Sequence, residues 1–230
     1  MTHHPDSDGM DPRVRGVDFF GRLAASVSHE INNVMTIINE KSGLLEDLAY
    51  AAEQGCALDP ARVRDIGASF ARQTRRGVEI LRRFNKFAHC VDEPSATFEL
   101  KSVLDNLASL CERLAQLRKI ELKTESLETG LNIHGDPFMV QHAVFACLDA
   151  VLDVLEPGGA ATLSMRGDAL DATVHVCAAP APERALDEGR LHTARTLAAC
   201  LRGRLDLTAG ADALVLTLTF PRCVSASGEA

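Results

Sequence analysis

The residues of this chain whose types and spacing could carry chemistry gather in one short stretch, "SHEINN", at residues 28–33. It places His29, Glu30 and Asn33 within about one helical turn of each other. Two consecutive asparagines are unusual inside a helix, because their side chains compete for backbone hydrogen bonds. The stretch therefore calls for a functional explanation as well as a structural one.

The surrounding residues predict a long helix that begins at Asp18. Small and apolar residues recur at gaps of three and four along residues 20–52, the pattern of a narrow helical seam. His29 lies two residues from both Val27 and Ile31 of this seam, so at about 100° per residue it points away from it. We expect an exposed imidazole with a carboxylate and an amide within reach.

Three interpretations of the cluster compete. A zinc protease signature needs H-E-x-x-H, but its fifth position here is Asn33. The second interpretation is a solvated helix face with an incidental histidine. In the third, His29 is a nucleophile: a neutral imidazole attacks phosphorus through one ring nitrogen when a carboxylate such as Glu30 holds the other N–H. Asn33 could then orient a water molecule or a phosphoryl oxygen.

A second helix is expected after a short connection. Gly55 suits a position just after the first helix, and Asp59-Pro60 is typical of a helix start. The second helix should run to about His89, giving an antiparallel hairpin. Because one hairpin with an apolar stripe on each helix cannot bury both stripes well, we expect a homodimer that forms a four-helix bundle.

The stretch "SHEINN", placed early in the first helix of a dimerising hairpin, resembles the H-box of sensor histidine kinases. The resemblance covers residues 18–89 and implies that His29 carries a phosphoryl group, that Glu30 assists its transfer, and that Asn33 supports dephosphorylation of a response regulator. The antiparallel hairpin also brings three basic residues near the level of His29, where we expect one or two of them to neutralise the phosphoryl group. These candidates are Arg82, Arg83 and Lys86.

The rest of the chain predicts a different kind of domain. Residues 90–96 read as a linker, residues 97–222 as an α/β domain, and residues 1–17 and 223–230 as tails, the first of them disordered. Expected strands cover residues 97–100, 120–125, 131–135, 160–165, 172–177, 204–210 and 213–220, and expected helices cover residues 100–117, 138–155 and 187–201. This order predicts an α+β protein in which the hairpin precedes a two-layer α/β sandwich.

The α/β domain resembles the ATP-binding domain of the same kinases, with a degenerate nucleotide site. Asp136, Pro137 and Gln141 are landmarks of the family's N-box helix. Counted from Gln141, the two asparagines that would serve magnesium and phosphate fall on Phe145 and Asp149. Asp149 could touch a metal, but Phe145 could not.

The other nucleotide-binding elements of that family are also missing. The stretch that should hold the D-x-G-x-G turn, "VHVCAAPAPERAL", contains neither aspartate nor glycine, and the chain leaves no room for a lid. Gly158-Gly159 is better explained as a C-cap with a turn than as a phosphate cradle. We therefore expect that ATP binding is lost and that the protein has no cofactor or metal of its own. A receiver-domain partner would carry the magnesium ion.

Composition narrows the class of partner. A net charge of −8 and a pI near 5.5 argue against nucleic acid, because phosphate binding requires a basic surface. No segment was expected to approach the length of a membrane span, and the seven scattered cysteines predict buried thiols in a reducing cytoplasm.

Together these observations resemble the dimeric histidine phosphotransferases of phosphorelays. The expected function is transfer of a phosphoryl group between receiver-domain aspartates through His29 without ATP, with the degenerate domain as a docking surface. One alternative is a response-regulator phosphatase or pseudokinase in which Asn33 positions water. A second alternative is a non-catalytic dimeric adaptor, for which His29 would be dispensable.

Overall fold

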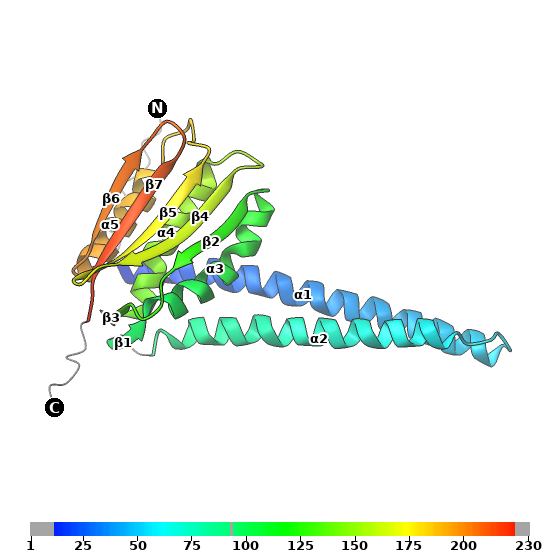
Figure 1. Ribbon diagram of the computed structural model, residues 1–230. Coiled ribbons are helices and arrows are strands. Elements are labelled where there is room, and N and C mark those ends of the chain that lie inside the picture. The colour runs from blue at the N-terminus through cyan, green and yellow to red at the C-terminus, as the bar shows by residue number, and fades with distance from the viewer. Residues whose placement is uncertain (1–11, 93, 224–230) are drawn as a thin grey trace. The chain divides into compact units, whose positions relative to one another are not determined.

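The computed structural model describes residues 12–92 and 94–223 (Figure 1). Helix α1 spans Pro12–Glu53, so the expected start at Asp18 is too late. Residues 1–11 and 224–230, which account for most of the two expected tails, lie outside the described residues. The described chain divides into two compact units, one formed by Ala24–Asn85 and the other by the residues up to Leu23 together with Lys86 onward.

The unit Ala24–Asn85 is a helical hairpin built from most of α1 and most of α2 (Pro60–His89). Gly55 adopts φ +88° just after α1, and Asp59 Oδ1 accepts a hydrogen bond from Ala61 N at 2.9 Å at the start of α2. The sequence predicted both features, the glycine after the first helix and the aspartate at the start of the second. Between the helices, Val34 and Gly77 are buried, and a Cβ atom at Gly77 would lie 3.4 Å from Val34 Cγ1. The glycine thus allows close packing at this level.

The second unit is the predicted two-layer α/β sandwich, which confirms the α+β class. Its elements are β1 (Ala96–Glu99), α3 (Leu100–Leu117), β2 (Glu121–Leu127), β3 (Asn132–Gly135), α4 (Pro137–Val154), β4 (Ala160–Gly167), β5 (Asp171–Ala179), α5 (Glu188–Cys200), β6 (Arg204–Ala209) and β7 (Leu214–Pro221). The main sheet has the order β2-β4-β5-β7-β6, and only its β2–β4 pair is parallel. Helices α3, α4 and α5 cover one face of this sheet (Figure 1).

Strand alternation explains the two layers. On β4, Ala161, Leu163 and Met165 are fully buried, whereas the residues between them are only half-buried. A period of two directs one set of side chains toward the helices and the other toward solvent. The β5 strand follows the same pattern in register with β4, with Leu163 opposite Val176.

Helix α4 is the centre of this core, and it corrects one expectation. Asp136 caps it by accepting hydrogen bonds from Phe138 N and Met139 N, as its position before Pro137 predicts. By length and composition, Pro137–Val154 is apolar enough to cross a membrane, although no such segment was expected. However, 83% of the helix is buried inside the protein, which is what a core helix requires.

The cysteines also differ from expectation. All seven are free thiols, but only Cys111 and Cys147 are buried, whereas Cys56 and Cys200 are exposed. Burial raises the pKa of Cys147 to about 12 and raises that of Cys111 as well. Scattered spacing in the sequence carries no information about burial, because several of these cysteines lie at helix ends or strand edges.

This difference predicts selective alkylation. Iodoacetamide at pH 8 should label Cys56 and Cys200 in the folded protein and spare Cys111 and Cys147, because only the thiolate reacts. At a pKa of about 12, roughly one Cys147 thiol in ten thousand is ionised at that pH. Peptide mass spectrometry would measure the labelling, and urea should expose all sites. Rapid labelling of Cys147 without urea would contradict the packing of α4.

Candidate functional site

The polar cluster lies on α1 within the hairpin unit. His29 and Asn33 are exposed in the single chain, as their helical positions predict, and Glu30 is half-buried. The helix is continuous through the paired asparagines, and Thr36 Oγ1 donates a hydrogen bond to the carbonyl oxygen of Asn32 at 2.9 Å. The imidazole is therefore accessible to a partner protein on a rigid element.

The basic residue beside this cluster is Arg76, to which no sequence motif points. Arg76 Nη2 lies 3.8 Å from Glu30 Oε2 across the hairpin. This long, partly exposed pair contributes little to stability, but it limits where the carboxylate can lie. Glu30 faces the α1–α2 interface as well as solvent. Its position at the flank of the apolar seam was the feature of the sequence that could have predicted a basic partner on the second helix.

The three selected basic residues have other partners. Arg82 and Arg83 both donate hydrogen bonds to Glu79, at 2.9 and 2.7 Å from their Nε atoms, and these bonds lower the pKa of Glu79 to about 2. Lys86 Nζ donates to Ser102 Oγ at 2.7 Å. The phosphoryl-stabilising role of these three residues stays a prediction.

A second concentration of charge lies in the α/β unit around Asp149, whose side chain is only 3% exposed. Arg22 of α1 donates two hydrogen bonds of 2.6 Å to this carboxylate, from Nη1 to Oδ2 and from Nη2 to Oδ1. Arg190 Nε lies 2.8 Å from Oδ2, and Arg118 Nη2 lies 3.6 Å from Oδ1. Three guanidinium groups thus surround one buried carboxylate.

Opposing influences set the ionisation of Asp149. Burial, the largest single influence, raises its pKa, but the hydrogen bonds from Arg22 and the positive charges of Arg22, Arg190 and Arg118 together hold the pKa below its usual value. The group is therefore a carboxylate near neutral pH. Because its oxygens face guanidinium groups, the suggestion that Asp149 could contact a metal does not fit this environment.

Phe145 occupies the other position at which the kinase family places an asparagine. It is 4% exposed and packs against Phe19, with ring centroids 4.8 Å apart. The Arg22 guanidinium carbon lies 5.0 Å from the Phe145 ring centroid, a cation–π contact. Phe19 also stacks on His142 at 4.8 Å and meets the Phe87 ring edge-on at 5.3 Å. This position therefore serves hydrophobic packing.

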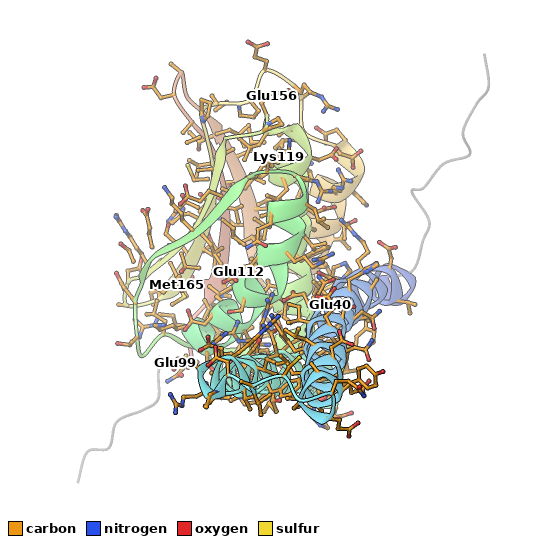
Figure 2. The ribbon with its side chains drawn as sticks, turned by 90° about the vertical axis from the view of Figure 1, so that its right-hand side faces the viewer. Glu40, Glu99, Glu112, Lys119, Glu156 and Met165 are labelled. Carbon is orange, nitrogen blue, oxygen red and sulfur yellow. The ribbon has the colours of Figure 1, made fainter. Side chains whose placement is uncertain are left out.

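The paired glycines after α4 form a turn. The C-cap residue of α4 is Leu155, so the expectation that the glycines cap the helix is wrong, whereas the expected turn is present. Gly158 has φ +94° and donates its N–H to Lys119 O at 2.8 Å, while Gly159 N donates to Glu156 O at 2.9 Å. Lys119 and Glu156 lie at the same end of the α/β unit (Figure 2). Both glycine amides are thus already hydrogen-bonded within the turn.

These features define a class of fold: a helical hairpin with an exposed histidine, followed by a histidine-kinase-like α/β domain. No protein-family model and no curated protein matches the sequence. Among solved structures, the catalytic domain of histidine kinase ThkA is 14% identical, with a TM-score of 0.50, and the match covers 56% of this chain and 97% of that one. At this identity, the likeness shows the fold of the α/β domain.

Two further matches cover a larger share of the chain. A histidine kinase from Burkholderia phymatum STM815 is 15% identical, with a TM-score of 0.48, and the match covers 85% of this chain and 97% of that one. Acinetobacter baumannii histidine kinase AdeS is 11% identical, with a TM-score of 0.47, and the match covers 84% of this chain and 97% of that one. A further match is histidine kinase ThkA in complex with the response regulator protein TrrA.

Proposed function

We propose that this protein is a phosphohistidine carrier that exchanges a phosphoryl group with receiver-domain aspartates and does not use ATP. The observation that carries the proposal is the contrast between its two polar clusters. His29 is exposed beside Glu30 on a helix, whereas Phe145 and Asp149 are buried among aromatic and arginine side chains. The acceptor is accessible, and the position for nucleotide chemistry is filled by core packing.

The proposed chemistry balances without a nucleotide. A neutral His29 ring nitrogen attacks the phosphorus of a receiver aspartyl phosphate, the N–P bond forms, and the P–O bond to the aspartate breaks. The aspartate leaves as a carboxylate, and the positive charge on the imidazole is relieved when Glu30 accepts the proton from the other ring nitrogen. Transfer to a second receiver is the reverse reaction. Proximity and alignment in the docked complex supply the rate, and the receiver supplies the magnesium ion.

The hairpin also has the surface that the proposed homodimer needs. In the single chain, exposed apolar residues include Met35 (53%), Leu45 (37%), Val78 (61%) and Leu81 (47%). Along α1, the apolar residues Ile31, Met35, Ile38 and Leu45 are spaced by four, three and seven, with Ser42 in the longest gap. Along α2, Ala71, Val78 and Leu81 are spaced by seven and three, with Thr74 in the longer gap. This heptad spacing is typical of a second helical seam, so a partner hairpin would complete a four-helix bundle.

The dimer predicts a specific change in mass. The native protein should be a dimer at micromolar concentration, and Leu81→Asp should make it monomeric, because the change puts unpaired charges into the seam. Leu170→Asp is the matched control, since Leu170 is 76% exposed on a turn of the other unit. Multi-angle light scattering gives the mass of each. A monomeric native protein would exclude this bundle.

The direct test of function compares two phosphoryl donors. The purified full chain is incubated with labelled ATP and magnesium, and separately with a labelled, phosphorylated receiver domain. We expect label from the receiver only, in an acid-labile, base-stable linkage typical of phosphohistidine. Labelling by ATP alone, or micromolar ATP affinity in calorimetry, would restore an ATP-dependent kinase activity.

A second candidate function, response-regulator phosphatase, rests on one observation. Asn33 is exposed one turn after His29, where its amide could orient a water molecule toward a docked aspartyl phosphate. The two functions differ in whether His29 itself carries phosphate. Receiver domains would be the partners in both.

A further inference from the structure

Two cavities that share part of their wall lie in the α/β unit. The first, of about 710 Å³, has a mainly apolar wall that includes Val17, Phe20, Val91, Phe138 and Met139. The second, of about 590 Å³, is lined by residues from the ends of β3, α5 and β7. Pro94, Asp136 and Met139 line both cavities, so the two spaces lie on either side of a shared wall.

The second cavity contains the positive charge. Arg202 and Arg222 line it together with His134. Arg202 is exposed, and Arg222 Nη1 donates to the carbonyl oxygen of Asp168, while its Nε is buried without a hydrogen-bond partner among residues 12–92 and 94–223. The His134 ring lies between two hydroxyl groups, 3.2 Å from Ser95 Oγ and 3.1 Å from Thr97 Oγ1.

The acidic group on the shared wall, Asp136, is directed toward backbone N–H groups at the start of α4. Asp136 Oδ1 accepts hydrogen bonds from Phe138 N at 2.8 Å and Met139 N at 3.1 Å, so its charge is paired with the N-terminus of α4. The two arginines therefore dominate the polar end. An apolar space with a cationic end matches an extended ligand that is apolar along its body and anionic at one terminus.

We propose that the two cavities form one binding site for a free monoacyl anion of the fatty-acid type. Its alkyl chain lies in the first cavity, and its carboxylate meets Arg202 and Arg222 in the second. Each cavity alone is within the range of volumes that proteins use for small ligands, and the charged groups lie in the second cavity, where they would fix the orientation of the chain. Val17, Phe20 and Ala88 bring the ends of both hairpin helices into the wall.

Dodecanoate below its micelle concentration is the probe, with 1-anilinonaphthalene-8-sulfonate as the fluorescent reporter. The full-length protein should enhance the fluorescence of the reporter, and dodecanoate should displace it. Dodecanol, which has the same chain but no charge, should displace it roughly ten-fold more weakly, the loss of one charge-assisted contact. Failure of the native chain to bind either probe would overturn the proposal.

Two pairs of variants locate the site. Val17→Glu places a charge at the apolar wall and should weaken dodecanoate at least about ten-fold, whereas Leu117→Glu, at the exposed end of α3 and outside both cavity walls, should not. Arg202→Gln should weaken dodecanoate and leave dodecanol unchanged, with the exposed Arg166→Gln as its control. All four positions are exposed, and circular dichroism would verify the fold. Equal effects within either pair would exclude these cavities.

The source of the acyl chain is tested separately. The full chain is mixed with phosphatidylglycerol vesicles and floated on a density gradient. A free monoacyl ligand predicts that the protein stays in the dense fractions while dodecanoate binds. Flotation with the vesicles, without binding of dodecanoate, would overturn the proposal in favour of a bilayer surface.

Discussion

His29→Gln is expected to abolish transfer of label from a phosphorylated receiver domain to this protein. Glutamine can accept and donate hydrogen bonds, but it has no nucleophilic ring nitrogen to form the N–P bond. The loss should exceed about a thousand-fold, because no other group replaces the acceptor. His29 is exposed in the single chain, so circular dichroism and light scattering should show an unchanged fold and dimer.

The neighbours of His29 should give graded effects in the same assay. Glu30→Gln should slow transfer by roughly 10- to 1,000-fold, the range for a lost proton acceptor. Arg76→Gln should have a smaller effect, since its contact with Glu30 is long, at 3.8 Å, and the Arg76 side chain is exposed. Asn33→Ala should spare transfer but slow loss of phosphate to water.

The same variants separate the alternative functions. If His29→Gln leaves receiver dephosphorylation at full rate and Asn33→Ala removes it, the protein is a phosphatase. If neither change affects phosphate flow, the polar cluster is only a solvated helix face, and the protein is an adaptor. Loss of transfer in His29→Gln, with the dimer retained, supports the carrier.

Local signals in the sequence were sufficient to predict most of the fold. The bounds of α3 match the expected helix. Asp136 lies at the start of α4 and Gly55 lies just after the end of α1, as their residue types predict. The start of α1 was missed, although Pro12 follows an aspartate as Pro60 and Pro137 do. The Asp-Pro pair at residues 11–12 is the same helix-start signal, but the polar composition of the first 17 residues favoured the prediction of a disordered tail.

The two polar clusters differ in how far sequence could reveal them. His29 and Glu30 are consecutive residues of one helix, so their relative position, about 100° apart around the helix axis, follows from helical geometry alone. The partners of Asp149 come from residues 22, 118 and 190, on three elements that only the tertiary fold brings together. Sequence identified Asp149 as a position of interest, but the choice between a metal ligand and an arginine-bound carboxylate depends on contacts between distant segments.

Asp149→Ala should lower the free energy of unfolding by roughly 3 kcal/mol, because removing one partner of a buried ion pair leaves the other charges uncompensated. Arg22 loses both of its 2.6 Å hydrogen bonds, whereas Arg190 keeps its 2.9 Å contact with Asp153. The cost should therefore lie toward the low end for buried pairs. Urea unfolding, followed by circular dichroism, measures it.

Two further variants distinguish the charge of Asp149 from its volume. Asp149→Asn keeps the shape and removes the charge, so at neutral pH its cost should approach that of Asp149→Ala. Asp105→Ala is the exposed control, because its pair with Lys101 lies on the surface of α3 and should contribute less than about 1 kcal/mol. A cost for Asp149→Asn no greater than that of this control would show that packing, rather than charge, holds the position.

The pH dependence of stability provides the sharper test of the charge. Since the arginines lower the pKa of Asp149 in the folded protein, the carboxylate stabilises the fold above the unfolded pKa of about 4, and this contribution is lost as pH falls through the folded value. The difference in unfolding free energy between the native protein and Asp149→Asn should therefore be constant from pH 6 to 8 and shrink in acid. A difference that stays constant down to acid unfolding would mean that Asp149 does not stabilise the core through its charge, and the arginines would then need another explanation.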